Sequence, residues 1–117
     1  MINTKRTLKS FTYAWTGIKE AVRRENNIRV QLILAVVVFL AAATLHLNRY
    51  EDMALTFAVG MVLVLELTNT AIEKLVDHLH PHEHSEVAFV KDVLAGSVLV
   101  ASIVALIIAA LVFYPHL

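Results

Sequence analysis

The sequence predicts an all-α membrane protein with an N-terminal amphipathic surface helix and three transmembrane helices. Apolar residues make up 58% of the 117-residue chain, which is too many for an ordinary soluble domain of this length. Long apolar stretches occur three times, and seven of the ten Lys and Arg residues lie before residue 30. We therefore expect one membrane-embedded domain over residues 1–117.

Residues 4–27 have the pattern of an amphipathic surface helix. Its apolar side chains recur every three or four residues: Leu8, Phe11, Trp15, Ile18 and Val22. Basic side chains occupy the opposite face, and basic helices with aromatic residues on the apolar face are typical of membrane surfaces. The alanines at 41–43 could imitate a signal-peptide cleavage site, but the basic segment before the apolar run is too long and too regular for a signal peptide.

Three apolar segments follow, over residues 28–47, 53–77 and 91–114. Twenty helical residues reach about 30 Å, which matches the hydrocarbon core of a bilayer. Basic residues are concentrated before the first span, and none follows the third. The positive-inside rule therefore predicts that the N-terminus and the loop at 78–90 lie in the cytoplasm and that the C-terminus lies outside.

A stripe of polar side chains crosses the second span. It consists of Glu66, Asn69, Glu73 and Asp77, whose spacings of 3, 4 and 4 residues place them on one helix face. Glu66 lies about 16 Å along the helix from Asp77, where a charged group costs about 2.5–3.5 kcal/mol. Carboxylate and amide oxygens are ligands that Mg²⁺ favours. The chain has no Cys and the stripe has no His, so we do not expect a zinc site there.

Two interpretations of this stripe remain open. It could be a metal and proton-transfer site, or a polar seam that holds helices together with Lys91 or Arg29 neutralising an acid. Glu25 precedes the first span, and Lys91 and Asp92 open the third, so further charge lies at the same membrane boundary and favours a functional site. The alternating histidines at 78–84 could chelate a metal adventitiously, although a solvated loop explains them more simply.

Four segments of the chain carry a family resemblance: residues 11–17, 25–29, 66–77 and 91–97. The most specific is the pattern E-x-x-N-x-A-I-E-x-x-V-D at 66–77. Together they resemble the small integral-membrane prokaryotic lipid kinases, which comprise diacylglycerol and undecaprenol kinases. The resemblance implies a homotrimer in the bacterial cytoplasmic membrane that phosphorylates a lipid hydroxyl with ATP. The segments at 11–17 and 95–97 favour undecaprenol as the acceptor, with diacylglycerol as the alternative.

The resemblance also implies roles for individual residues. Glu66 is the general base, and Glu25 and Glu73 hold Mg²⁺ against the ATP phosphates. The residues implied in nucleotide or substrate binding are Tyr13, Asn69, His84, Lys91 and Asp92. Residues 82–84 read His-Glu-His where the family often has Glu-Tyr-His, which leaves the adenine contacts open.

Glycine and charge content narrow the possible partners. The sequence contains no G-x-x-x-x-G-K-[ST] P-loop, and its three glycines do not form the Gly-rich loop of protein kinases, so side chains must hold the nucleotide. The formal net charge is zero, and we expect no nucleic-acid partner.

Overall fold

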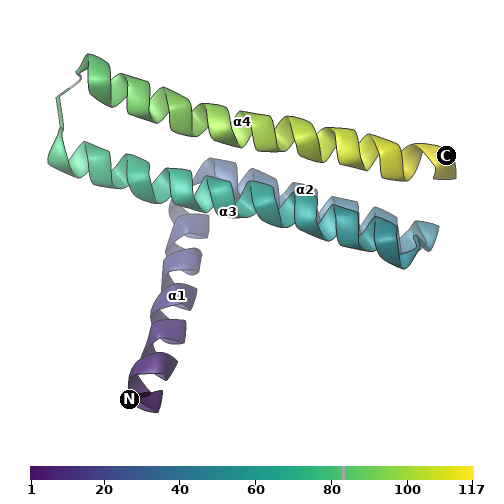
Figure 1. Cartoon of the computed structure of the whole chain (residues 1–117), viewed down its shortest axis with the longest axis horizontal. Helices are drawn as coiled ribbons and strands as arrows, with labels where there is room; N and C mark the ends of the chain where they lie inside the picture. Colours follow the sequence, from purple (N-terminus) through teal and green to yellow (C-terminus); the bar gives the residue numbers. More distant parts are fainter. Residues whose placement is uncertain (83) are drawn as a thin grey trace.

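The computed structural model describes residues 1–82 and 84–117, and these residues form four α-helices and one short 3₁₀ turn (Figure 1). The helices are α1 (Thr4–Arg24), α2 (Asn26–Leu45), α3 (Arg49–Leu79) and α4 (Ser85–Phe113), and the turn is η1 (Tyr114–His116). There is no β-strand in the described part of the chain. The predicted all-α class is therefore confirmed.

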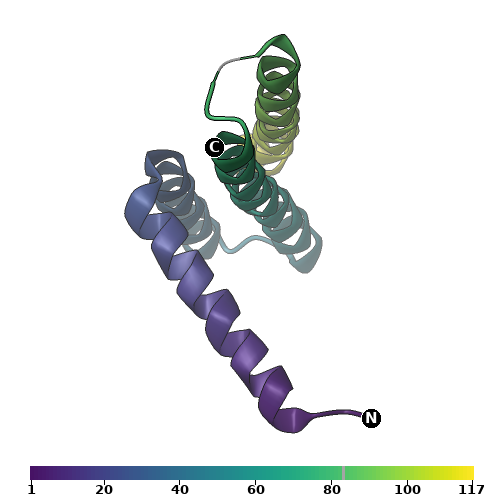
Figure 2. The same cartoon turned by 90° about the vertical axis from the view of Figure 1, so that its left-hand side faces the viewer.

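Helices α2, α3 and α4 are each long and apolar enough to cross a membrane. They run side by side in both views, with α3 between the other two, and α3 packs more extensively on α4 than on α2 (Figures 1 and 2). Many of their large apolar side chains, including Ile33, Leu99 and Leu106, are exposed on the outside of the bundle. Lipid can cover such a surface, so the chain is a multi-pass membrane protein.

Small residues let the three helices approach one another. Ala35 and Ala42 on α2 and Ala58 on α3 are all buried between helices. Ala42 also packs with Leu55 and Val112 in a cluster near the C-terminal end of the bundle. In lipid, where helices gain little from hydrophobic burial, such close contact supplies much of the packing energy.

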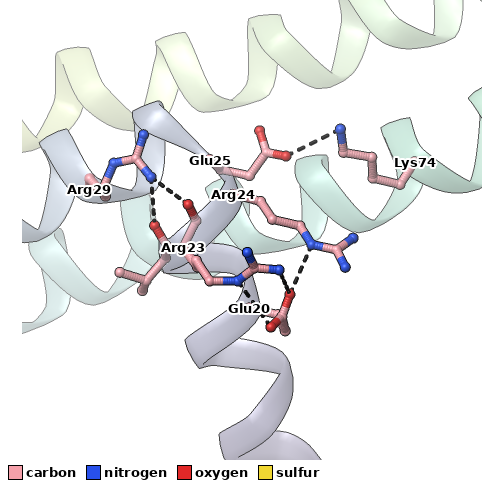
Figure 3. A network of polar contacts seen from close by, with 7 residues as sticks. Glu20, Arg23, Arg24, Glu25, Arg29 and Lys74 are labelled. Atoms are coloured by element: carbon pink, nitrogen blue, oxygen red, sulfur yellow. Dashed lines mark hydrogen bonds and ion pairs between the residues drawn. The ribbon is translucent and has the colours of Figure 1, made fainter.

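Helix α1 stands apart from the bundle and runs at a steep angle to it (Figures 1 and 2). The sequence predicted a helix over 4–27, whereas α1 ends at Arg24 because Glu25 adopts an extended conformation. The Arg29 guanidinium donates to the carbonyl oxygens of Val22 (3.0 Å) and Arg23 (2.7 Å), as Figure 3 shows. These bonds satisfy carbonyls that lack a helical partner, so the chain can turn sharply into α2.

The other helix ends also differ from the limits of the apolar segments. Asn48 and Glu51 form a reciprocal capping box, so α3 starts at Arg49 rather than at 53. At its other end α3 runs to Leu79, two residues beyond the predicted limit. Helix α4 starts at Ser85 rather than at 91, and His84 caps it by accepting a hydrogen bond from the Glu86 N–H (3.1 Å). At the loop that joins them, α3 and α4 therefore both extend beyond their apolar segments.

Candidate functional site

Polar contacts tie the helices together at the end of the bundle that carries the α1–α2 corner and the α3–α4 loop. Glu25 at this corner pairs with Lys74 of α3, with 3.3 Å between Oε1 and Nζ (Figure 3). Lys91 of α4 donates a hydrogen bond to Asp77 of α3. Helix α3, which carries the predicted polar stripe, is thus joined to the α1–α2 corner and to α4.

Glu66 is the one buried charged side chain in residues 1–82 and 84–117, with 4% of its surface exposed. The Asn27 side chain forms a hydrogen bond with its carboxyl group, and Glu73 and Glu25 are the charged groups that act on it electrostatically. A buried carboxyl is costly unless it is hydrogen-bonded, and Asn27 meets this need. One acid is therefore held inside the bundle, near enough to two further acids for their charges to act on it.

Sequence reasoning did not identify Asn27 or Lys74 as site residues. Asn27 lies two residues after Glu25, in the first turn of α2, and Lys74 directly follows Glu73. A polar amide at the start of an apolar span and a cation beside a predicted ligand were the available signals. Neither signal reveals the contact itself, because the contact depends on how α2 is rotated against α3.

The oxygen-bearing side chains of Glu25, Asn69 and Glu73 can be compared with what a magnesium ion requires. In the described residues no three His, Cys, Asp or Glu side chains converge into a metal site. Mg²⁺, however, is usually held by one or two carboxylates together with substrate phosphates and water. Glu25 is half-buried, Glu73 is exposed, and Asn69 adds an amide oxygen on the same helix face. The set therefore fits an ion that arrives with a nucleotide better than it fits a closed metal cage.

Lys91 and Asp92 begin the apolar part of α4 beside the end of α3. The Lys91 side chain is one-third exposed (33%) and lies against Asp77, whereas Asp92 is exposed. An ammonium group is thus held at the same end of the bundle as the three glutamates.

The remaining predicted residues lie apart from this cluster. Tyr13 is exposed on α1, and His84 is the cap of α4. His80, His82 and His84 line a hollow of about 540 Å³ around Pro81, but they do not meet as a metal site in the described part of the chain. The predicted departure at 82–84 includes Glu83, which lies outside the described residues.

A groove of about 390 Å³ separates α1 from α3. Small and apolar residues line most of it, and Glu20, Arg24, Glu25 and Lys74 supply its charge. Arg23 and Arg24 both pair with Glu20, at 2.8 and 2.9 Å (Figure 3). The hydrogen bond from Arg23 is the main cause that lowers the pKa of Glu20, so Glu20 remains an anion that engages both arginines.

Comparison with known proteins places these features in a wider group. The sequence profile described as prokaryotic diacylglycerol kinase matches residues 12–113. A diacylglycerol kinase of Synechocystis sp. is 38% identical over 94% of this chain, and the match spans 63% of that longer protein. An undecaprenol kinase of Bacillus subtilis is 36% identical over 96% of this chain and 91% of its own length. A diacylglycerol kinase of Escherichia coli is 28% identical over 95% of this chain and 91% of its own length.

Proposed function

The chain belongs to the prokaryotic diacylglycerol kinase family, and from this premise we propose that it transfers the γ-phosphate of Mg-ATP to the hydroxyl of undecaprenol at the cytoplasmic membrane face. The relatives are named as lipid kinases, which supports a lipid phosphotransferase. The main support for this chemistry is the buried Glu66 carboxyl, which forms a hydrogen bond with Asn27 and lies near enough to Glu25 and Glu73 for their charges to act on it.

Glu66 serves as the general base in this proposal. Its carboxylate accepts the proton of the lipid hydroxyl while the hydroxyl oxygen forms a bond to the γ-phosphorus and the bond to the ADP oxygen breaks. Asn27 acts as a positioning residue in this proposal, because its hydrogen bond orients the carboxyl that accepts the proton. A positioned base of this kind contributes about 10²–10⁴ to a rate.

Glu25 and Glu73 hold the magnesium ion that accompanies ATP, and Asn69 supports them. When bound, Mg²⁺ neutralises charge on the phosphates and aligns them for displacement. Lys91 and Asp92 bind the nucleotide from α4, and Tyr13 and His84 are assigned to adenine. Side chains take the place of the backbone cradle that other ATP-binding folds supply.

The site also requires an orientation and an assembly. We place the N-terminus and the α3–α4 loop in the cytoplasm and the C-terminus outside, with α1 on the membrane surface. The exposed Leu8, Phe11 and Trp15 support that position, because they suit the bilayer interface. A homotrimer would bring groups from neighbouring chains to one site. The exposure of Tyr13 and Glu73 in a single chain supports such sharing.

The choice of acceptor lipid depends on the space around small residues of α4. A Cβ added at Gly96 would meet nothing within 4 Å, so close packing inside one chain does not require this glycine. Ser97 lines an apolar groove of about 300 Å³ between α3 and α4. Open space beside small residues suits a long isoprenoid chain, although it could also receive a neighbouring helix. Diacylglycerol is the second candidate, favoured by the name of the Synechocystis relative.

A transfer assay tests the acceptor. Purified protein in mixed micelles receives ATP labelled at the γ-phosphate, with undecaprenol or diacylglycerol at equal mole fraction. We expect preferential labelling of undecaprenol. Preferential labelling of diacylglycerol would keep the chemistry and reverse the acceptor. If folded, assembled protein labels neither lipid, the kinase proposal is wrong.

A further inference from the structure

Lys74 supplies a cation to one of the two proposed metal ligands. Its ammonium lies 3.3 Å from Glu25 Oε1, and it links α3 to the corner between α1 and α2 (Figure 3). Along the chain Lys74 directly follows Glu73, the other proposed ligand. A lysine and a magnesium ion would therefore compete for the same carboxylate oxygen.

The neighbouring cation is engaged elsewhere. Arg24 and Lys74 both line the groove between α1 and α3, but Arg24 pairs with Glu20 through its Nε at 2.9 Å. The Lys74 side chain is 62% exposed, and exposed ion pairs of this kind are weak and easily exchanged. Its flexible stem allows the ammonium to move without a change in the helix.

We propose that Lys74 is a resident counter-ion of Glu25, which it releases to the divalent cation and then leaves to bind a phosphate oxygen of the nucleotide. This inference rests on the proposed metal role of Glu25. Before the nucleotide binds, the pair neutralises a half-buried carboxylate. If a divalent cation bound that carboxylate, the freed ammonium would remain in the groove that Lys74 and Glu25 line, beside the site where phosphates would accompany the metal.

If the pair of Lys74 and Glu25 were only a structural salt bridge, a different result would be expected. Loss of such a bridge would destabilise the α1–α2 corner and leave the affinity for metal unchanged or weaker. Competition predicts that removal of the Lys74 ammonium strengthens metal binding. The two explanations therefore differ in the sign of one measurable effect.

The test measures Mn²⁺ binding by electron paramagnetic resonance, without nucleotide, on full-length protein in nanodiscs of zwitterionic lipid. We expect Lys74→Met to lower the Kd for Mn²⁺ by about two- to fivefold, the range that corresponds to a weak exposed pair. Lys74→Arg retains the charge and should bind as the wild type does. Arg24→Met removes a nearby positive charge that does not pair with Glu25, and it should change the Kd less than Lys74→Met does.

A second measurement tests the contact with phosphate. When Mg²⁺ is saturating, competition between Lys74 and the metal for Glu25 no longer affects nucleotide binding. Under this condition Lys74→Met should weaken equilibrium binding of a non-hydrolysable ATP analogue by about threefold or more. An unchanged affinity would overturn the phosphate contact. Lys74→Gln provides a polar substitute if the methionine variant fails to fold.

The outcomes separate this inference from the proposed function. Mn²⁺ binding that Glu25→Gln weakens, but that Lys74→Met leaves unchanged or weakens, would overturn the role of Lys74 alone. Wild-type protein that binds no Mn²⁺ without nucleotide, or binds it independently of Glu25, would overturn this inference, because the competition requires that the ion reach the Glu25 carboxylate before the nucleotide does. The role of Glu25 toward a metal that arrives with ATP is tested separately, by Glu25→Gln in the transfer assay.

Discussion

Asn27, in the first turn of α2, forms a hydrogen bond with the buried carboxyl of Glu66 on α3. The contact joins the helix after the α1–α2 corner to the deepest acid of the polar stripe. It gives the buried carboxyl a hydrogen-bond partner on a neighbouring helix, although Asn27 itself is exposed. If Glu66 is a general base, a change at Asn27 should affect catalysis without touching either substrate.

Replacement of Asn27 by alanine is expected to lower kcat about tenfold while the KM for ATP stays nearly constant. The expected loss reflects a carboxyl that is no longer held in position. Steady-state kinetics in mixed micelles measures both constants. Asn26→Ala is the matched control, because Asn26 is a second exposed asparagine in the same turn and has no assigned contact with Glu66. Equal effects at the two positions would argue against a specific role for Asn27.

Lys91→Met is expected to raise the KM for Mg-ATP about tenfold, because a charge-assisted contact to the nucleotide is lost. Asp77→Asn removes the negative charge that pairs with Lys91 but keeps the ammonium, and it should raise the KM by a much smaller factor. Equal effects of the two substitutions would indicate that Lys91 acts only as a brace between α3 and α4.

Arg29→Met should loosen the end of α1. The guanidinium donates to two carbonyl oxygens there, and losing about 1 kcal/mol of hydrogen bonding corresponds to roughly fivefold faster local opening. Hydrogen exchange of the amides in the last turn of α1 measures this opening. Amides in the middle of α2 serve as the internal reference, and uniform acceleration of both would contradict a local role.

Glu20 should make the C-terminal turn of α1 sensitive to acid. Arg23, and to a lesser degree Arg24, lower the pKa of Glu20 from its ordinary value of 4.5. The stabilisation is therefore present above about pH 4.5 and is lost as the pH falls through the lowered pKa. Hydrogen-exchange protection of this turn, corrected for intrinsic rates, should decrease as the pH is lowered in the wild type and should stay constant in Glu20→Gln. Parallel profiles would contradict the assignment.

The sequence predicted the membrane helices better than it predicted their ends. Apolar stretches of sufficient length identify spans because the bilayer requires them. Helix ends instead follow individual hydrogen bonds, such as the capping box at Asn48 and the bonds from Arg29. This is why α3 and α4 extend beyond their apolar cores and α1 stops before residue 27.

The candidate site was predictable only where it depends on spacing within one helix. Helical spacing alone places Glu66 and Glu73 on one face of α3. The contacts of Asn27 and Lys74 depend on the packing between helices, which spacing within one helix does not determine. Tyr13 was assigned through the family resemblance, and in one chain it lies exposed on α1, so its role stays a prediction.

The central claim is that the polar stripe is a phosphotransfer site and not an assembly seam. The most direct test is the rate of γ-phosphate transfer by Glu66→Gln, with the oligomeric mass measured on the same preparation. The amide keeps the size of the side chain and cannot accept the proton. We expect transfer to fall by about 10²–10⁴ with the mass unchanged. Retained transfer together with an altered mass would contradict the claim.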